Sequence, residues 1–371
     1  DQATSFEWNL RLRHEQVDDD AFARDAAATT LRARAGLRFR FDNGFHALVE
    51  GEGIAAPGDG YNSGANGRAD RPLVADPEGA ELNQAYVGWR GDVFGVIAGR
   101  QRLLFDNQRW VGNSGWRQNE QTFDALALDW RIAPGWSARY AWLDRVHRVS
   151  GDRALDHRAR ERDLDTHLAE IAWKQGVQQL AGYAWLHEDR DVAAASTRTV
   201  GLRSTTDLVR DGNGFALTLE VARQRNYANN PLAFSHRYWL VEPAYTWRGT
   251  SFRAGWEHLG GDGVHALQAP LGTLHAFNGW ADKFNATPAA GLEDRYLAAG
   301  GKLGQGRYDW QLAWHDYRAD AGDARYGREW NASFGFPVAK GVRGLAKLAD
   351  YRADAWARDT TKLWMQLEWA N

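Results

Sequence analysis

Alternation between apolar and polar residues, with a period of two, recurs along nearly the whole chain. Residues 362–369 carry Leu, Met, Leu and Trp on one parity and Lys, Trp, Gln and Glu on the other. Residues 6–13 repeat the pattern, with Phe, Trp, Leu and Leu opposite Glu, Asn, Arg and Arg. A period of two is the period of a β-strand, and strands with one apolar and one polar face suit a wall between lipid and water. The repetition therefore predicts an all-β fold, a transmembrane, antiparallel, up-and-down β-barrel.

The composition agrees with one barrel domain and excludes a helical membrane protein. The 371 residues contain no Pro/Ser-rich linker, and the composition and alternating pattern do not change along the chain, so we expect a single domain over residues 1–371. The mean hydropathy is −0.59, and the chain lacks the run of about 18 apolar residues that a spanning helix needs. The 19 tryptophans favour aromatic girdles at the two membrane interfaces, with aromatic core packing as the alternative.

Several features indicate where the protein resides. The chain has no cysteine, which suits passage through an oxidising periplasm. It starts at Asp1 without a basic, apolar leader, so we expect that a signal peptide has been removed. With the barrel pattern, these features predict the outer membrane of a Gram-negative bacterium, with lipid and lipopolysaccharide around the barrel. No lipid-face strand looks polar enough to need a partner, so we expect a monomer while the oligomeric state stays open. The net charge of −3 gives no indication of nucleic-acid binding.

Tight turns and long polar loops alternate without a break, which fixes the expected number of strands. Each turn contains Gly, often beside Asn, Asp or Pro. They lie at residues 42–44, 90–92, 133–135, 174–176, 211–214, 248–250, 304–306 and 339–341. The loops lie near residues 18–25, 55–79, 106–120, 150–162, 189–195, 226–233, 260–291, 320–323 and 352–358. This interleaving predicts about 18 strands, with short periplasmic turns and long extracellular loops; weak alternation near 93–104 and 196–208 leaves 16 as the alternative.

The polar parity, which should face the lumen, is rich in arginine. In the second predicted strand, Arg32, Arg34, Arg38 and Arg40 form a ladder on one wall. Further inward cations are Arg11, Arg13, Arg100, Arg102, Arg139, Arg145, Arg253, Arg343 and Lys347. Because guanidinium groups bind carboxylates bidentately, this pattern favours anionic solutes. Inward acids such as Glu7, Glu50, Glu52 and Glu220 leave an alternative open, namely that these arginines form structural ion pairs.

Two stretches resemble motifs of the alginate-export family of outer-membrane proteins. The first is GRQRLLFDNQRWVG at 99–112, followed by WRQN at 116–119 and FDA at 123–125. The second is PLGTLHAFNGWADKF at 270–284, preceded by WEHLGGD at 256–262 and followed by GLED at 291–294. The resemblance implies an 18-stranded monomeric barrel with an electropositive pore for an anionic uronate polymer or smaller solutes. The chain is short for a dedicated polymer exporter, and it ends on Asn371 rather than on an aromatic residue.

The two motifs also supply candidate site residues. A loop that folds inward would bring Arg100, Arg102, Arg109 and Arg117 to a constriction. Three acids near that loop could tie it to the barrel wall, and we call them candidate latches: Asp106, Glu120 and Asp124. In the second motif, His275, Trp280, Asp282 and Lys283 lie among Gly and aromatic residues. That composition suits a compact cap more than a carbohydrate platform.

The sequence offers no enzyme, metal or cofactor signature. His147, His157 and His167 are not at ligand spacing, and the acidic run Asp18–Asp20 is better explained as a solvated loop than as a calcium site. We therefore expect a non-enzymatic channel for passive passage of anionic saccharides or small organic acids through an arginine-lined pore. An export conduit for a secreted anionic polysaccharide such as alginate is the alternative, and a non-conducting structural barrel is the third hypothesis.

Overall fold

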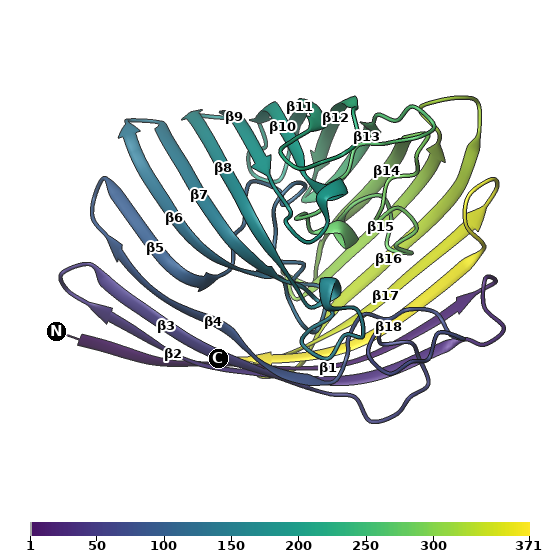
Figure 1. Ribbon diagram of the computed structural model, residues 1–371, viewed down its shortest axis with the longest axis horizontal. Coiled ribbons are helices and arrows are strands. Elements are labelled where there is room, and N and C mark those ends of the chain that lie inside the picture. The colour runs from purple at the N-terminus through teal and green to yellow at the C-terminus, as the bar shows by residue number, and fades with distance from the viewer. Residues whose placement is uncertain (1) are drawn as a thin grey trace.

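A computed structural model describes residues 2–371 as one 18-stranded antiparallel sheet that closes on itself (Figure 1). The strands are β1 (Gln2–Asp19), β2 (Ala26–Phe41), β3 (Phe45–Ala55), β4 (Gly79–Arg90), β5 (Phe94–Gln101), β6 (Thr122–Ala133), β7 (Trp136–His147), β8 (Glu161–Gln175), β9 (Gln178–His187), β10 (Thr197–Asp207), β11 (Gly214–Asn226), β12 (Ser235–Trp247), β13 (Thr250–Leu259), β14 (Leu292–Leu303), β15 (Tyr308–Arg318), β16 (Arg325–Ala339), β17 (Val342–Ala353) and β18 (Thr360–Ala370). Three short 3-10 helices, η1 (His157–Ala159), η2 (Ala193–Ala195) and η3 (Leu274–Ala276), lie in the loops. Within residues 2–371, no helix has the length and apolar character needed to span a membrane.

The first and last strands pair and close the barrel. β1 and β18 run antiparallel from Asn9 opposite Ala370 to Asp19 opposite Thr360, and the purple strand β1 and the yellow strand β18 lie side by side in Figure 1. All other strands pair with their neighbours in chain order. Closure leaves no unpaired sheet edge, as a membrane-spanning sheet requires.

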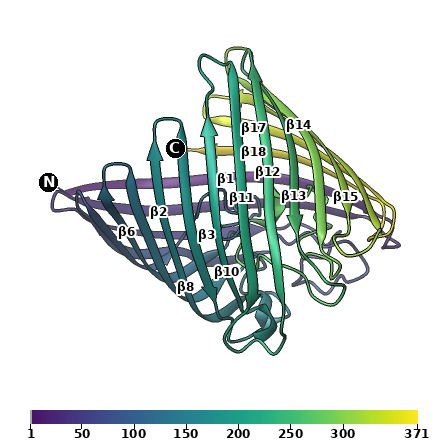
Figure 2. The same ribbon diagram turned by 90° about the horizontal axis from the view of Figure 1, so that it is seen from above.

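The predicted strand count is confirmed, and the 16-strand alternative is wrong. Each of the eight predicted turns joins two strands, and each of the nine predicted loops joins the next pair. The two weakly alternating stretches contain β5 and β10; β5 pairs along its whole length with β6, and β10 along its whole length with β11. Figure 2 shows the long loops gathered at one end of the strands and the short turns at the other.

The two parities face opposite sides of the wall, as predicted. Phe6 and Met365 are 57% and 56% exposed on the outer face, whereas Arg13 and Arg32 are each 1% exposed inside. Exposed tryptophans lie near both ends of the strands, as girdles require; examples are Trp130 and Trp247 near the turns and Trp256 and Trp330 near the loops. Trp110, Trp185 and Trp364, by contrast, are buried inside the barrel. Part of the tryptophan excess therefore packs the interior.

An apolar core fills part of the lumen. It joins side chains of the loop 102–121, such as Phe105 and Trp110, to side chains of the loop 260–291, such as Leu271 and Phe284. Inward residues of the wall complete the core, including Tyr183, Trp185, Tyr238, Tyr317 and Tyr351. We call residues 102–121 the first inner loop and residues 260–291 the second inner loop. Strand side chains alone cannot fill a barrel of this size, so these loops narrow it.

Candidate functional site

The two inner loops meet inside the barrel and bond through their backbones. The Gly112 N–H donates to the Leu271 carbonyl at 2.9 Å, and the Thr273 N–H donates to the Gln108 carbonyl at 3.0 Å. The side-chain amide of Gln121 donates to the carbonyls of both Gly112 and Leu271, at 2.9 and 3.0 Å. Val111 and Leu271 form an isolated parallel bridge. The two loops therefore behave as one unit across the lumen.

Arginines of β1 and β2 hold the first inner loop by its carbonyl groups. Arg13 donates to the Trp116 carbonyl at 2.6 Å, and its guanidinium lies 4.0 Å from the centre of the Trp116 ring. Arg32 and Arg34 donate to the Gln118 carbonyl at 3.4 and 3.3 Å. Each of these bonds carries a charged donor, which makes it stronger than a neutral one. Arg32 and Arg34, the ladder residues nearer the long loops, thus donate hydrogen bonds to the protein's own backbone carbonyls.

The ladder also pairs with inward carboxylates. Arg34 forms ion pairs with Glu52 and Glu120, the latter at 3.3 Å. Arg38 bonds to Glu7 at 2.5 Å. Arg102, in the first inner loop, forms ion pairs with Glu120 at 2.5 Å and Glu50 at 2.9 Å. Arg40 of the ladder, by contrast, is exposed and has no ion pair within residues 2–371. Structural pairing, which the sequence left open as an alternative, accounts for most of these contacts.

Two of the three candidate latches connect the first inner loop to the wall. Asp106 forms an ion pair with Arg203 of β10 at 2.6 Å, and Glu120 accepts a hydrogen bond from Asn83 of β4 at 2.7 Å. Asp124 lies in β6 and bonds to the wall residues Arg100 and His147, so it joins strands rather than the loop.

A further anchor was not predicted. Trp110 of the first inner loop donates from its indole N–H to Glu220 of β11 at 2.8 Å. The sequence identified Glu220 as an inward acid, but only the folded loop brings Trp110 to it. Arg203, which ion-pairs with Glu220 at 2.6 Å, was also missed as a site residue.

The second inner loop carries a buried polar cluster around Asp282. The Asp282 carboxylate contacts His275 at 2.7 Å, Lys362 of β18 at 2.7 Å and Arg117 of the first inner loop at 3.0 Å. The other ring nitrogen of His275 lies 2.7 Å from the Nζ of Lys347 in β17. A lysine beside a histidine nitrogen donates to it, so the His275 Nδ1 proton must be the one directed at Asp282. The cluster joins both inner loops to β17 and β18.

Aromatic rings enclose the cations of this cluster. The His275 ring stacks on Trp116 with 4.9 Å between centroids and 7° between planes. Lys347 lies 3.9 Å from the centre of the Trp116 ring and 3.8 Å from that of Trp280. Lys347 was predicted to line the pore, but it is only 8% exposed. Lys347 therefore lies where the two inner loops contact the barrel wall.

The cluster predicts that the inner loops loosen in acid. Burial lowers the pKa of His275 well below its ordinary value of 6.5. Burial alone would raise the pKa of Asp282, but His275, Lys362 and Arg117 hold it well below 3.8. A released loop would therefore bind more protons than a docked one, and docking weakens as the pH falls below about 6.5. We expect single-channel current noise to grow between pH 7.5 and pH 5, and His275→Gln to flatten this dependence above pH 5. A conductance independent of pH in this range would contradict the prediction.

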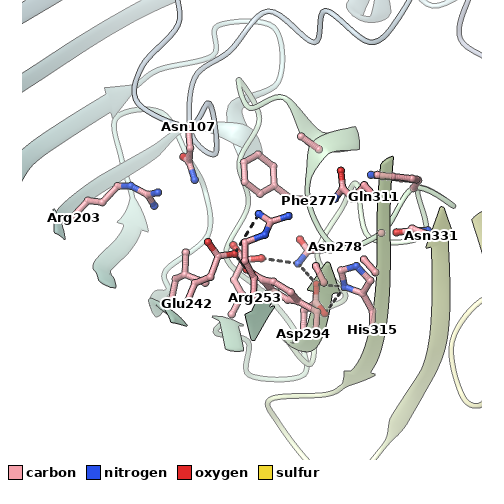
Figure 3. Close-up of a pocket in the computed structure, with 18 residues that line it drawn as sticks. Asn107, Arg203, Glu242, Arg253, Phe277, Asn278, Asp294, Gln311, His315 and Asn331 are labelled. Carbon is pink, nitrogen blue, oxygen red and sulfur yellow. Dashed lines mark hydrogen bonds and ion pairs between the residues drawn. The ribbon is translucent and has the colours of Figure 1, made fainter. Parts of the chain in front are cut away.

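Beside the second inner loop lies a cavity of about 340 Å³, shown in Figure 3. The strands β10 and β12 to β16 and the second inner loop provide most of its lining, and Asn107 of the first inner loop completes it. Its polar and aromatic lining residues include Arg203, Glu242, Arg253, Glu257, Phe277, Asn278, Trp280, Asp294, Tyr296, Gln311, His315 and Asn331.

Most charged groups in this cavity already have ion-pair or hydrogen-bond partners within the protein. Glu257 forms an ion pair with Arg109 at 2.9 Å and accepts a hydrogen bond from Asn278 at 2.7 Å. Asp294 accepts from Asn278 at 3.0 Å and from His315 at 2.8 Å. These contacts hold Asn278 of the second inner loop against β13 and β14 (Figure 3).

Arg253 differs from Arg203, the other arginine that lines this cavity. Its side chain is 39% exposed, and its only ion-pair contact within residues 2–371 is Glu242 at 3.8 Å. Its guanidinium makes no hydrogen bond within the same range, while Glu242 accepts one from Tyr296. A guanidinium has five N–H donors, so Arg253 presents open donors to the cavity.

The remaining predicted site residues are spread over the wall. Arg139 pairs with Asp129 at 3.2 Å and donates to the Leu104 carbonyl at 3.0 Å, and Arg145 pairs with Asp163 at 2.8 Å. The structure thus brings Arg32, Arg34, Arg102 and Arg117 together around the first inner loop. Arg139 also contacts the first inner loop, through the Leu104 carbonyl, whereas Arg145 and Arg253 lie apart from that group.

The closed barrel of 18 strands, narrowed by two inner loops, defines an outer-membrane barrel of the porin type. Residues 2–258 match the family model described as alginate export, so the chain belongs to the alginate-export family. Fold and family together place the protein in the bacterial outer membrane.

Solved structures share the fold over nearly the whole chain. OpdO of Pseudomonas aeruginosa superimposes with a TM-score of 0.76 at 16% identity, over 99% of this chain and 97% of that one. OccAB1 of Acinetobacter baumannii gives a TM-score of 0.78 at 12% identity, over 99% and 96%. OpdK of Pseudomonas aeruginosa gives 0.74 at 13% identity, over 99% and 98%. No protein with a curated description matches the chain in sequence.

Proposed function

We propose that the protein is a passive outer-membrane channel for small anionic solutes, either acidic saccharides or organic acids. The observation that carries this proposal is the open guanidinium of Arg253 in the lumen cavity. A solute carboxylate would accept from Arg253 bidentately and replace the loose contact with Glu242. Interior charges of this kind are the usual means of selection in pores.

The rest of the cavity suits a hydroxyl-rich or aromatic carboxylate. The side-chain amides of Asn107, Gln311 and Asn331 border the cavity and offer donors and acceptors to hydroxyl groups. The rings of Phe277 and Trp280 offer apolar surface to a sugar ring or a carbon skeleton. OpdK, which shares the fold at 13% identity, has been crystallised with vanillate, itself a small carboxylate.

Passage of small solutes fits the inner loops better than passage of a polymer. The loops bond to each other and to β1, β2, β10, β11, β17 and β18, so clearing the lumen would break many polar contacts together. The family description, alginate export, supports the alternative of a conduit for an anionic polysaccharide. That alternative requires the two loops to move out of the way.

A planar-bilayer measurement tests the proposal. We expect wild-type channels in a KCl gradient to prefer chloride, and galacturonate to reduce their current reversibly. Arg253→Gln should weaken this block by about tenfold or more, because a hydrogen bond to a charged group contributes about 1.5–3 kcal/mol. The matched control is Arg343→Gln, since Arg343 is 50% exposed and pairs with Asp309 at 2.5 Å near the short turns.

Three outcomes would count against the proposal. A clear preference for potassium would contradict anion selection. Equal block of wild type and Arg253→Gln by galacturonate would show that the solute does not bind at Arg253 in the cavity. Translocation of alginate chains at the rate of monouronates would favour the export alternative.

A further inference from the structure

Three potential metal ligands converge at the loop end of the barrel, outside the lumen cavity. His258 is the second-last residue of β13 and lies directly opposite Glu293 of β14 in the sheet register. Asp320 reaches the same point from the loop between β15 and β16. One ligand atom from each of the three side chains lies within 4.8 Å of the other two. From this convergence we propose that His258, Glu293 and Asp320 bind a divalent transition-metal ion, with Zn²⁺ as the best match.

The second oxygen of each carboxylate is already fixed by another group. Asp320 Oδ2 accepts the backbone N–H of Gly261 at 3.0 Å, and Glu293 Oε2 accepts from Arg295 at 2.7 Å. The remaining oxygens, Asp320 Oδ1 and Glu293 Oε1, lie 3.7 and 3.9 Å from the Nδ1 atom of His258. Such outer contacts are how proteins orient carboxylate ligands toward a metal.

The His258 ring is held with its Nδ1 atom toward these oxygens. Its ring stacks on Trp239 with 5.3 Å between centroids and 7° between planes. The Nδ1 atom is buried and has no hydrogen-bond partner within residues 2–371. Distances of 3.7 and 3.9 Å exceed a hydrogen bond, so a direct bond to either carboxylate does not satisfy this atom. A buried polar atom without a partner is costly, and a bound cation would satisfy it.

The donor set selects the class of cation. One imidazole nitrogen and two carboxylate oxygens are ligand types that Zn²⁺ accepts, and three protein ligands leave its fourth position to water. Ca²⁺ and Mg²⁺ prefer oxygen ligands throughout and would leave the nitrogen unused. Ligand atoms around a tetrahedral zinc lie about 3.4 Å apart. The separations of 3.7 and 3.9 Å from Nδ1 are thus within a few tenths of an ångström of that value.

A metal at this point would join three segments at the extracellular rim. Asp320 bonds to Gly261 through its side chain, and its own N–H donates to the Ala290 carbonyl at 2.9 Å. Gly261 and Ala290 lie at the two ends of the second inner loop. The ion would therefore fasten both ends of that loop to β13 and β14.

Titration of the folded, full-length barrel with ZnCl₂ tests the proposal. After treatment with chelator, we expect calorimetry to show one Zn²⁺ per barrel, and Co²⁺ to give the visible absorption of a tetrahedral complex. His258→Ala should weaken Zn²⁺ binding by at least the roughly 10- to 100-fold that loss of an outer contact costs. Asp320→Asn should also weaken binding while keeping an acceptor for Gly261.

The control is His14→Ala, because His14 is an exposed histidine of β1 bonded at 2.9 Å to Thr29. It should bind Zn²⁺ as wild type does. Heat-modifiable migration on gels verifies that every variant is folded. Stoichiometric binding that survives in folded His258→Ala would overturn the proposal, as would an absence of Zn²⁺ binding to wild type or equal binding of Ca²⁺.

Discussion

Asp282→Asn should weaken the attachment of the inner loops to the wall and raise the single-channel conductance several-fold. The substitution leaves Arg117 and Lys362 buried without their shared carboxylate. Removing one partner of a buried ion pair costs about 3–5 kcal/mol, because an uncompensated charge remains. That cost falls on the docked loop conformation, since the strands themselves keep all their backbone bonds. Planar-bilayer recordings of the conductance and its noise measure the result.

A matched control separates this effect from a general loss of charge. Asp156→Asn removes a carboxylate that is 51% exposed and pairs with Arg158 in an outer loop. Exposed pairs contribute little, so its conductance should equal that of wild type. An unchanged conductance in a folded Asp282→Asn barrel would show that the Asp282 cluster does not hold the loops.

Leu219→Arg should destabilise the barrel far more than the same substitution one residue earlier. Leu219 is 40% exposed on the lipid face near the middle of β11. An arginine on the lipid face at the bilayer midplane costs about 2–4 kcal/mol. Thr218 faces the lumen opposite Glu242, so Thr218→Arg places its charge in water beside a carboxylate.

Urea unfolding in lipid vesicles would measure both variants. We expect the unfolding midpoint of Thr218→Arg to remain near that of wild type and that of Leu219→Arg to fall. Equal midpoints for the two variants would contradict the assignment of lipid and lumen faces in β11.

The fold was predictable because its information is local. Each strand carries its own alternation, and each turn carries its own glycine, so strands can be counted without knowing their partners. Trp364 illustrates the limit of this approach. It lies on the polar parity of 362–369, which placed it inside the barrel, but its burial against Trp116 depends on a loop far away in sequence.

The candidate site was harder to predict because parity states which way a side chain points and not what it meets. The ladder residues Arg32 and Arg34 were correctly placed inside, yet a principal partner is the backbone carbonyl of Gln118. Backbone carbonyls have no sequence signature, so parity could not show which guanidinium groups bond to the protein's own backbone. Arg253, by contrast, was indistinguishable from its neighbours until its lack of hydrogen bonds was visible in three dimensions.

The anchoring of the first inner loop to β1 and of the second to β18 has a consequence for how the protein folds. Arg13 and Trp116 are 103 positions apart, and Asp282 and Lys362 are 80 apart. Such contacts join parts of the chain that are far apart in sequence, so they cost more loop-closure entropy than the pairing of consecutive strands. Both anchors also use the two strands whose pairing closes the ring. Docking of the inner loops should therefore be the last event of refolding, after a wide and leaky closed ring has already inserted in the membrane.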